Sequence, residues 1–463
     1  MKSVLLINPW IFDFAAYDFW IRPLGLLYVA AVLRESADVD LRLIDCLDRS
    51  HPALGTLPGR KADGRGHYPK VEVPKPAVLE SVPRRYSRYG LPLEVFEREL
   101  DLVPAPDMVL VTCAMTYWYP GVQLAVDLVR RKFGAVPVVL GGAYATLAED
   151  HARRHSGADV VVAGPGENRI PALARDILGD RAVPRTASYA AFPDLPRPAF
   201  DLMRDASCLP LLTSRGCPFS CTFCASSLLS GRFEQRPPES VAAEIEDHAV
   251  RFGTRDFVFY DDALLLRKAE HIVPILEATA RLGRPVSFHA PNGLHIREID
   301  PAIARLFRRA GVRSLYLSQE SMDEEVLRDA CPKVAPGDLA RAMCCLEEAG
   351  YARADINVYL IAGLPGQDAA SVLESVRRVK ALGARPRIAY FSPIPGTRAW
   401  QALAEKGRIV PDADPLITNK SAYRFVGEGL SSEDYGELQD LLSGGRGPGL
   451  RQGIHFRRTR PCN

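Results

Sequence analysis

Three cysteines stand at a spacing that can hold an iron–sulfur cluster. Cys217, Cys221 and Cys224 form the pattern Cys-x3-Cys-x2-Cys. Three thiolates at this spacing can bind three corners of a [4Fe–4S] cube and leave the fourth iron open to a small-molecule ligand. A structural zinc site is the alternative, but zinc normally has a fourth Cys or His ligand, and none follows at the spacing of a zinc knuckle. The pattern therefore favours a cluster whose open iron can take part in chemistry.

The cysteine pattern resembles that of the radical SAM superfamily. In that family the open iron binds the amino and carboxylate groups of S-adenosylmethionine (SAM), and an electron cleaves SAM to a 5′-deoxyadenosyl radical. Phe223, directly before the last cysteine, matches the aromatic residue that packs near the adenine in the family. The resemblance implies an enzyme that uses a [4Fe–4S] cluster and SAM; it identifies no catalytic side chain beyond these binding residues.

Composition and charge are those of a globular protein with more than one domain. The chain has 463 residues, of which 47% are hydrophobic and 25% are charged, enough for two or three domains with ordinary cores. The formal net charge of +2 gives no electrostatic reason to expect nucleic acid or an anionic membrane as a partner. No apolar stretch approaches the ~20 residues of a membrane span, and the first apolar run is too short for a signal peptide. The other cysteines are scattered, so we expect a cytoplasmic protein.

The first part of the chain has the pattern of a doubly wound α/β domain. We expect buried parallel strands at residues 4–9, 41–45, 108–112, 136–140 and 159–163, and helices near 22–36, 120–133, 143–155 and 168–178. This alternation predicts a Rossmann- or flavodoxin-like domain with a parallel sheet over residues 1–185. Residues 47–105 are rich in Pro, Arg and Gly, and we expect an insertion with little regular structure before a helix near 93–101.

The loops that follow these strands are suited to a large ligand. In such folds ligands bind outside the carboxyl ends of the strands, where this sequence has Thr112, Gly141, Gly142 and Gly164. Glycine lets the backbone approach a ligand closely. The same glycines could equally do no more than make tight strand-to-helix turns.

These loops are similar to the cobalamin-binding domain that precedes many radical SAM cores. The segment 23–33, the Gly141-Gly142 pair and Gly164-Pro-Gly-Glu167 match its recurring segments. The resemblance implies cobalamin held near Thr112, Gly141, Gly142 and Gly164. The histidine motif of many cobalamin domains is absent, since His67 lies in the insertion and His51 is no better placed. Cobalamin is therefore expected to lack a histidine lower ligand.

The second part of the chain has the pattern of a barrel. We expect strands at residues 209–213, 256–260, 286–290, 314–318, 356–361 and 387–391, and helices near 238–252, 268–282, 301–310, 336–349 and 368–382. Six such units predict a partial (β/α)6 TIM-type barrel over residues 205–400, after a linker at 186–204. A C-terminal extension follows at 401–463, with helices near 400–407 and 432–443 and a loose basic end.

Polar and small residues follow successive strands of this barrel. They are Asp261, Asp262, Asn292, Glu320, Ser321 and Gly363. Because functional groups of such barrels gather at the carboxyl ends of the strands, these residues should share one mouth. Carboxylates accept hydrogen bonds from ammonium and hydroxyl groups, Asn suits a carboxylate, and glycine admits an adenine. Each residue alone would more often be a helix cap or part of a turn.

The radical SAM resemblance assigns most of these residues to SAM. It implies that Asp261 supports the amino group, that Glu320 and Ser321 lie near the ribose, and that Gly363 lies beside the adenine. Asn292 is expected at the same ligand. The family's Gly-Gly-Glu form is missing at Asp261.

Four residues near these motifs have open or structural interpretations. Arg215, just before the first cluster cysteine, could stabilise the negative charge of the cluster or could be a solvated surface residue. Cys331, Cys344 and Cys345 suggest a second cluster, but adjacent thiols on a helix point about 100° apart. We interpret these three cysteines as packing residues.

The sequence therefore predicts a radical SAM enzyme with a [4Fe–4S] cluster, SAM and cobalamin. By family resemblance, the expected reaction is methylation of an unactivated carbon in a small molecule or natural product. The electron would come from a reducing partner such as flavodoxin or ferredoxin. A radical SAM cyclase or rearrangement enzyme with cobalamin as redox partner is one alternative. A non-catalytic Fe–S electron-transfer protein with a vestigial first domain is another, although it would not need SAM-suited groups at the strand ends.

Overall fold

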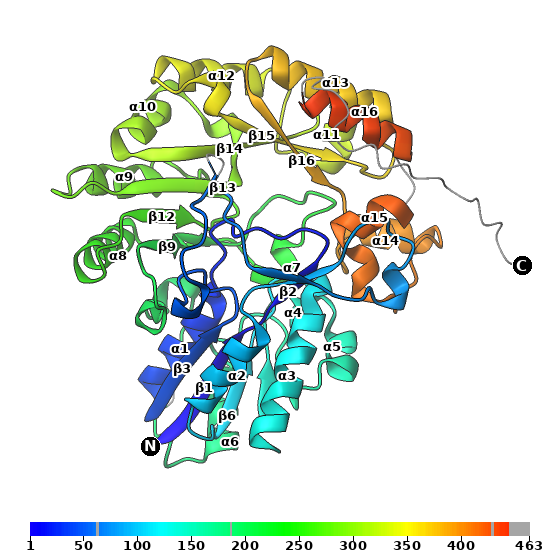
Figure 1. Cartoon of the computed structure of the whole chain (residues 1–463). Coiled ribbons are helices and arrows are strands. Elements are labelled where there is room, and N and C mark those ends of the chain that lie inside the picture. Colours follow the sequence, from blue (N-terminus) through cyan, green and yellow to red (C-terminus); the bar gives the residue numbers. More distant parts are fainter. Residues whose placement is uncertain (62–63, 186–187, 427–429, 444–463) are drawn as a thin grey trace, which may run out of the picture.

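Two parallel sheets, one from each part of the chain, form the framework of the protein (Figure 1). The computed structural model describes residues 1–61, 64–185, 188–426 and 430–443. The doubly wound sheet and the partial barrel that the sequence predicts are both confirmed. The boundaries of the four predicted segments, 1–185, 186–204, 205–400 and 401–463, stay predictions.

The first sheet has the strand order β3-β1-β6-β7-β8, and all its neighbours are parallel. Its strands are β1 (Lys2–Asn8), β3 (Val39–Asp45), β6 (Met108–Val111), β7 (Val138–Leu140) and β8 (Val160–Val161). Numbered along the chain, this order is 2-1-3-4-5, which is the flavodoxin-like arrangement. The carboxyl ends of all five strands therefore point to one edge, where ligands bind in this fold.

Successive side chains of β1 point to opposite faces of this sheet and pack into two separate hydrophobic cores. Val4 and Leu6 pack with α1 (Leu24–Ser36) and α6 (Ile170–Leu178). Leu5 and Ile7 pack instead with α3 (Tyr119–Phe133), α4 (Ala143–Leu147) and α5 (Glu149–His155). The period of two in a strand explains why a continuous apolar run can serve both cores.

The insertion holds more regular structure than the sequence predicts. Strands β4 (Lys70–Glu72) and β5 (Ser87–Tyr89) pair antiparallel in the order β2-β5-β4, and β2 (Ile11–Asp13) lies outside the insertion. The predicted helix is present as α2 (Leu93–Asp101). Regular structure before α2 is limited to such short pieces among the described residues, and the two strands were not predicted because strands of three residues have no detectable periodicity and one partner lies far away in the sequence.

The second sheet is the open barrel, in the sequential parallel order β9-β12-β13-β14-β15-β16. Its strands are β9 (Cys208–Leu211), β12 (Asp256–Phe259), β13 (Ser287–His295), β14 (Val312–Glu320), β15 (Asn357–Ala362) and β16 (Arg385–Tyr390). The covering helices are α8 (Pro238–Arg251), α9 (Ile272–Ala280), α10 (Pro301–Ala310), α12 (Asp338–Glu348) and α13 (Ala369–Ala381). Two short helices, α7 (Ser226–Ser230) and α11 (Glu324–Ala330), and the two-stranded pair of β10 (Ser214–Arg215) with β11 (Glu234–Gln235) were not expected.

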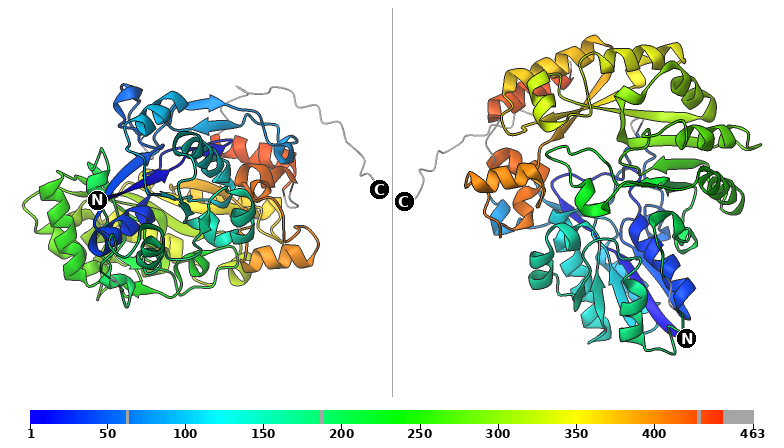
Figure 2. Two further views of the ribbon diagram at one scale, coloured as in Figure 1. Left: turned by 90° about the horizontal axis from the view of Figure 1, so that it is seen from below. Right: turned by 180° about the vertical axis from the view of Figure 1, so that it is seen from behind.

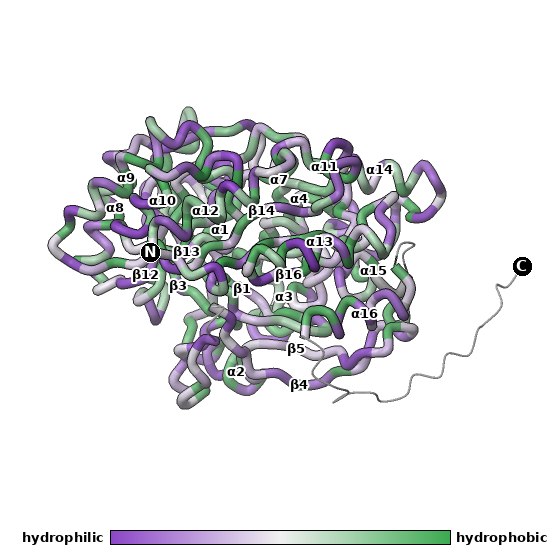
Figure 3. Tube along the Cα trace, turned by 90° about the horizontal axis from the view of Figure 1, so that it is seen from above, coloured by the Kyte–Doolittle hydropathy of each residue, from purple (hydrophilic) through white to green (hydrophobic). Residues whose placement is uncertain are grey.

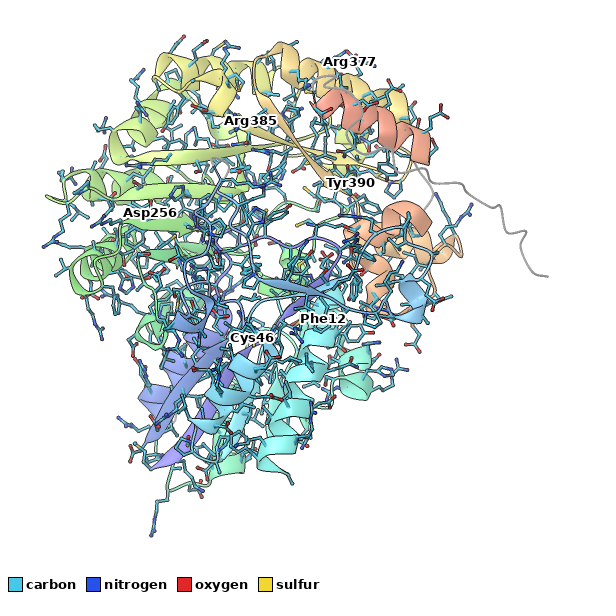
Figure 4. The ribbon with its side chains drawn as sticks, viewed as in Figure 1. Phe12, Cys46, Asp256, Arg377, Arg385 and Tyr390 are labelled. Carbon is cyan, nitrogen blue, oxygen red and sulfur yellow. The ribbon has the colours of Figure 1, made fainter. Side chains whose placement is uncertain are left out.

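The C-terminal helices lie against the last strands of the barrel. These helices are α14 (Arg398–Glu405), α15 (Lys420–Val426) and α16 (Ser432–Ser443). On α16, Glu437 pairs with Arg377 of α13 at 3.4 Å, and Gln439 donates to the hydroxyl of Tyr390 at 2.5 Å. Figure 4 labels Arg377 and Tyr390 beside that helix. The predicted loose basic end at 444–463 lies outside the described residues.

Hydrophobic and hydrophilic residues occur together in the same helix rather than in separate helices. Figure 3 shows hydrophobic and hydrophilic residues mixed within helices such as α3 and α13. Among the described residues, no helix has the length and apolar character needed to cross a membrane.

The first sheet and the barrel are joined by the segment that follows β2 (Figure 2). In this segment the Trp20 ring stacks on His289 of β13, with centroids 4.7 Å apart, and Phe19 packs edge-on against Tyr316 of β14 at 5.3 Å. The hydroxyl of Tyr260, just after β12, accepts from the backbone N–H of Arg22 at 2.9 Å. Side chains from the first part of the chain thus complete the interior of the open barrel.

A buried carboxylate fixes the joining segment to the insertion. Asp18 is fully buried and accepts from Arg60 at 2.6 Å, with Arg22 at 3.5 Å and Arg49 at 3.7 Å. Its backbone also pairs with Gly66 through two hydrogen bonds. One carboxylate thus compensates three largely buried guanidinium groups.

We expect Asp18→Ala to lower the free energy of unfolding by about 3–5 kcal/mol, because it leaves buried charges without their partner. The measurement is urea denaturation of the apoprotein, followed by circular dichroism. Asp40→Ala is the control: Asp40 forms an exposed pair with Arg42, and its loss should cost at most about 1 kcal/mol. Equal effects of the two substitutions would contradict a structural role for Asp18.

Candidate cofactor site

A cavity of about 470 Å³ lies where the carboxyl edge of the first sheet meets the start of the barrel. Thr112, Gly141, Gly142 and Gly164 line it from the first sheet. From the barrel it is lined by residues that include Ser214, Arg215, Gly216, Tyr260 and Asp262. The structure therefore brings the four predicted cobalamin-binding residues together, next to the segment that leads into Cys217.

The glycines of this cavity suit a ligand that approaches the backbone. A Cβ added at Gly141 or Gly164 would meet no atom within 4 Å, so both positions face open space. Gly142 has φ of +92°, and a Cβ there would lie 2.7 Å from the carbonyl oxygen of Cys113. Gly142, and Gly164 with φ of +75°, are thus needed by the backbone itself, and Gly141 and Gly164 leave room for a ligand.

Apolar side chains form much of the remaining cavity wall. They include Leu24, Tyr28, Val29, Leu110, Val139, Val162 and Ile170. Among the described residues that line the cavity there is no histidine. His67 packs edge-on against Tyr17 in the insertion. The residues therefore fit a large, largely apolar ring system such as cobalamin, and a cobalamin without a histidine lower ligand stays the prediction.

An ion pair connects the two parts of the chain. Glu167 Oε1 accepts from Arg215 Nη2 at 2.5 Å, and the guanidinium lies over the ring of Phe192 with its carbon 4.5 Å from the centroid. Both charged side chains are largely buried. Arg215 is therefore no solvated surface residue. The second oxygen of Glu167 is buried without a partner in the described structure, so it is free to accept from a ligand.

Asp261 holds the strand end from which the cysteine loop starts. Its carboxylate accepts from the backbone N–H and the hydroxyl of both Thr213 and Ser214, at 2.5–3.1 Å. Only 3% of Asp261 is exposed, and burial raises its pKa to about 6 although these hydrogen bonds oppose the rise. Four donors occupy this carboxylate, so its evident task is to position the loop. The predicted contact of Asp261 with the SAM amino group stays a prediction.

The neighbouring carboxylate, Asp262, is the one that lines the cavity. Ser226 donates to its Oδ2 at 2.5 Å, and the backbone N–H of the same serine donates to Cys224 Sγ at 3.4 Å. Burial raises the pKa of Asp262. A cationic group in the cavity would offset that desolvation.

The cysteine loop is held at its middle by two backbone hydrogen bonds. Thr222 donates its N–H to the carbonyl of Ala330 at 3.0 Å, and its own carbonyl accepts from Ala399 at 2.9 Å. Cys217 and Cys221 are half-buried, and Cys224 is exposed. No group of three His, Cys, Asp or Glu side chains in the described residues stands ready to hold a metal ion.

The chemistry of these thiols fits an iron–sulfur cluster. Burial raises the pKa of Cys217, and it raises that of Cys224 to about 11. Three thiols on one loop are the donor set that an iron–sulfur cluster takes, and binding of the cluster would release their protons.

The other predicted SAM contacts lie at strand ends of the barrel but do not line this cavity in the part of the chain described. Asn292 donates to the carbonyl of Tyr260 at 2.8 Å. Ser321 is buried and its hydroxyl accepts from the N–H of Asp323 at 3.1 Å. Gly363, with φ of +93°, donates its N–H to the side chain of Gln367 at 3.0 Å. Their roles toward SAM stay predictions.

Of the two remaining predicted contacts, Phe223 lies in the cysteine loop itself and Glu320 is the last residue of β14. Phe223 packs into an apolar cluster that includes Ile361 and Trp400. Glu320 has φ of +66° and pairs with Lys333 at 3.2 Å. Their roles toward SAM also stay predictions.

Sequence reasoning missed several residues beside the cysteine loop. Cys331, expected only to pack, is buried but has its sulfur 3.7 Å from that of Cys221. The His295 ring packs edge-on against Phe219 of the loop at 5.0 Å, and burial lowers its pKa to about 3. Lys333 contributes to that lowering. Cys331 and Lys333 are close to each other in the sequence. Both lie far along the chain from the cysteine motif, so spacing does not reveal that Cys331 contacts Cys221.

The other two cysteines lie away from the loop on α12. Cys345 is buried, as a packing residue should be. Cys344 is exposed, with its sulfur 3.8 Å from a guanidinium nitrogen of Arg353. The packing interpretation is therefore wrong for Cys344, because it occupies the outer side of the helix.

Two family models match parts of the chain. Residues 211–379 match the Radical SAM superfamily, and residues 94–174 match the B12 binding domain. The first match covers the cysteine loop and most of the barrel, and the second covers the loops of Thr112, Gly141 and Gly164. Both models thus meet at the cavity.

Relatives and solved structures agree with these matches. An uncharacterized methyltransferase of Pyrococcus horikoshii is 25% identical over 64% of this chain and 69% of its own length. The bacteriochlorophyllide d C-12(1)-methyltransferase of Chlorobaculum tepidum is 26% identical over 43% of this chain and 45% of its own length. The structure of the radical S-adenosylmethionine methyltransferase TsrM from Kitasatospora setae, with tryptophan and a SAM analogue bound, covers 89% of this chain and 77% of its own. Its TM-score is 0.64 at 18% identity, so the two proteins share the fold.

We expect Asp261→Asn to reduce the iron bound per chain after anaerobic reconstitution. The amide removes the negative charge that the four Thr213 and Ser214 donors share, and it puts a donor where Oδ2 now accepts from the Thr213 N–H at 3.3 Å; an unsatisfied buried donor costs about 1–3 kcal/mol. Iron and sulfide analysis of the purified protein measures the effect. Asp262→Asn is the matched control, since its carboxylate faces the cavity and the variant should keep its iron. Full iron in Asp261→Asn would contradict the positioning role.

Proposed function

We propose that this radical SAM enzyme, with its B12-binding domain, transfers a methyl group from SAM by way of cobalamin to an unactivated carbon of a small molecule or natural product. The observation that carries the proposal is the single cavity shared by the B12-domain loops and by the residues that lead into the cysteine loop. An electron carrier would have no use for such a cavity. The names of the relatives, which are methyltransferases, support methyl transfer over cyclisation or rearrangement.

The cofactors that the two domains imply supply the reactive chemistry. When bound, the [4Fe–4S] cluster with its electron cleaves SAM to a 5′-deoxyadenosyl radical, and cobalamin carries the methyl group. The cysteines Cys217, Cys221 and Cys224 would hold the cluster. The electron requires a reducing partner, for which flavodoxin or ferredoxin has the suitable chemistry.

The side chains of the cavity have separable tasks in this proposal. Asp262, oriented by Ser226, is suited to accept from the ammonium group of SAM. Gly141 and Gly164 admit the edge of the corrin, and the apolar wall excludes water from its face. The unpaired oxygen of Glu167 is suited to accept from an amide group on the corrin rim. Binding and orientation are thus the work of the chain itself.

The pair of Glu167 and Arg215 would also keep the two parts of the chain in register. It connects the loop after β8 to β10, two residues before Cys217. Because the pair is buried, removal of either partner leaves an uncompensated charge. The distance between the B12-binding loops and the cluster loop therefore depends on this contact.

We expect Gly141→Val to abolish retention of cobalamin while the protein stays folded. The added side chain would enter open space in the cavity rather than clash with the chain. The measurement is the cobalt chromophore that remains after purification with hydroxocobalamin and gel filtration. Gly283→Val is the control, because that glycine also has no neighbour within 4 Å but lies away from the cavity. Undiminished retention in Gly141→Val would contradict this binding site.

The proposed reaction predicts two products from SAM. Anaerobically reconstituted protein with hydroxocobalamin, a strong reductant and SAM should form both 5′-deoxyadenosine and S-adenosylhomocysteine, which chromatography separates. The triple substitution of Cys217, Cys221 and Cys224 to Ala should abolish the 5′-deoxyadenosine and leave cobalamin retention intact. Absence of SAM cleavage in the reconstituted protein would rule out the radical reaction. Formation of 5′-deoxyadenosine alone would favour the cyclase or rearrangement reaction instead.

A further inference from the structure

Cys331 is held against one of the cluster cysteines by backbone on both sides. The sulfurs of Cys331 and Cys221 lie 3.7 Å apart, and Cys331 is 1% exposed. Its N–H donates to the carbonyl of Leu327 within α11, while the N–H of Thr222 donates to the carbonyl of Ala330. The residues next to each cysteine are thus hydrogen-bonded, and the sulfur contact is part of the fold.

Lys333 places a positive charge beside the same loop. Its side chain is 12% exposed and its ammonium lies 3.2 Å from Glu320 Oε1. Glu320 has φ of +66°, a backbone conformation that is costly for a residue with a side chain. Lys333 follows Cys331 by only two positions, so its charge lies near the contact between the sulfurs of Cys331 and Cys221.

A cluster becomes more negative by one charge when it is reduced. Hydrogen bonds to its sulfurs and a positive charge nearby stabilise the reduced state more than the oxidised state, and so raise the reduction potential. In a buried setting these interactions are stronger than in water. When Cys221 binds iron it carries no proton, so the S–H of Cys331 is the group that can donate to it.

We propose that Cys331 and Lys333 are positioning residues that raise the reduction potential of the cluster bound by Cys217, Cys221 and Cys224. Cys331 donates a hydrogen bond to the sulfur of Cys221, and Lys333 supplies a buried positive charge. The inference rests on the cluster of the proposed function but does not depend on what the enzyme methylates. The reduction potential of the cluster determines how strong a reductant the enzyme needs.

The test compares variants that remove each interaction with variants that keep it. Cys331→Ala removes the donor and Cys331→Ser keeps an O–H donor; Lys333→Met removes the charge and Lys333→Arg keeps it. Each reconstituted protein is titrated with dithionite without SAM, and the midpoint potential is read from the optical and EPR signals. We expect Cys331→Ala and Lys333→Met to shift the potential downward beyond the error of the titration. The Ser and Arg variants should stay near wild type.

Two controls make the outcome decisive. Cys345→Ala removes another buried cysteine, on α12, and should leave the potential unchanged. Unchanged potentials in both Cys331→Ala and Lys333→Met, with full iron, would overturn the proposal. Loss of iron in Cys331→Ser would also overturn it, because Cys331 would then be a ligand. A wild-type protein that forms no cluster would instead refute the proposed function.

Discussion

The site depends on one buried carboxylate at the end of a strand. Asp261 sits just after β12 but bonds to Thr213 and Ser214, which follow the adjacent strand β9. It therefore fixes the point at which the irregular cysteine loop leaves these two regularly paired parallel strands. The loop that begins there must carry three thiols to one cluster, and the direction in which it leaves the sheet decides whether they can meet. Burial opposes ionisation of Asp261 and raises its pKa to about 6, and the four donors offset only part of that effect.

The second constraint is the contact between the two halves of the molecule. Parallel sheets each have one carboxyl edge where ligands gather, and here the first sheet presents its edge to the start of the barrel. Three kinds of contact maintain that arrangement. They are the Glu167–Arg215 ion pair, the hydrogen bond from the backbone of Arg22 to the hydroxyl of Tyr260, and the stacking of Trp20 on His289. Glu167, Arg215, Arg22 and Tyr260 also line the cavity, so these contacts shape the wall that a ligand would meet.

The sequence predicted the elements well where a single local signal identifies them. Apolar runs located all eleven strands of the two large sheets, because buried parallel strands are continuously hydrophobic. It failed where the signal is long-range. The short strands β4 and β5 depend on β2 near the start of the chain, and the contact of Cys331 with Cys221 spans 110 positions. Neither spacing nor composition can reveal such contacts.

The two adjacent carboxylates show why some residues of the candidate site can be identified from the sequence and others cannot. Asp261 and Asp262 follow β12 directly, but their carboxylates have different partners in different places. The sequence, read by resemblance, assigned the first to SAM, whereas the first is occupied by strand-end donors and the second lines the cavity. The three cysteines can be assigned without this ambiguity, because all three are on one loop and thiolates at that spacing have few other functions. A ligand motif is therefore readable from sequence when it lies in one continuous segment. A contact that depends on which of two neighbours turns inward requires the fold.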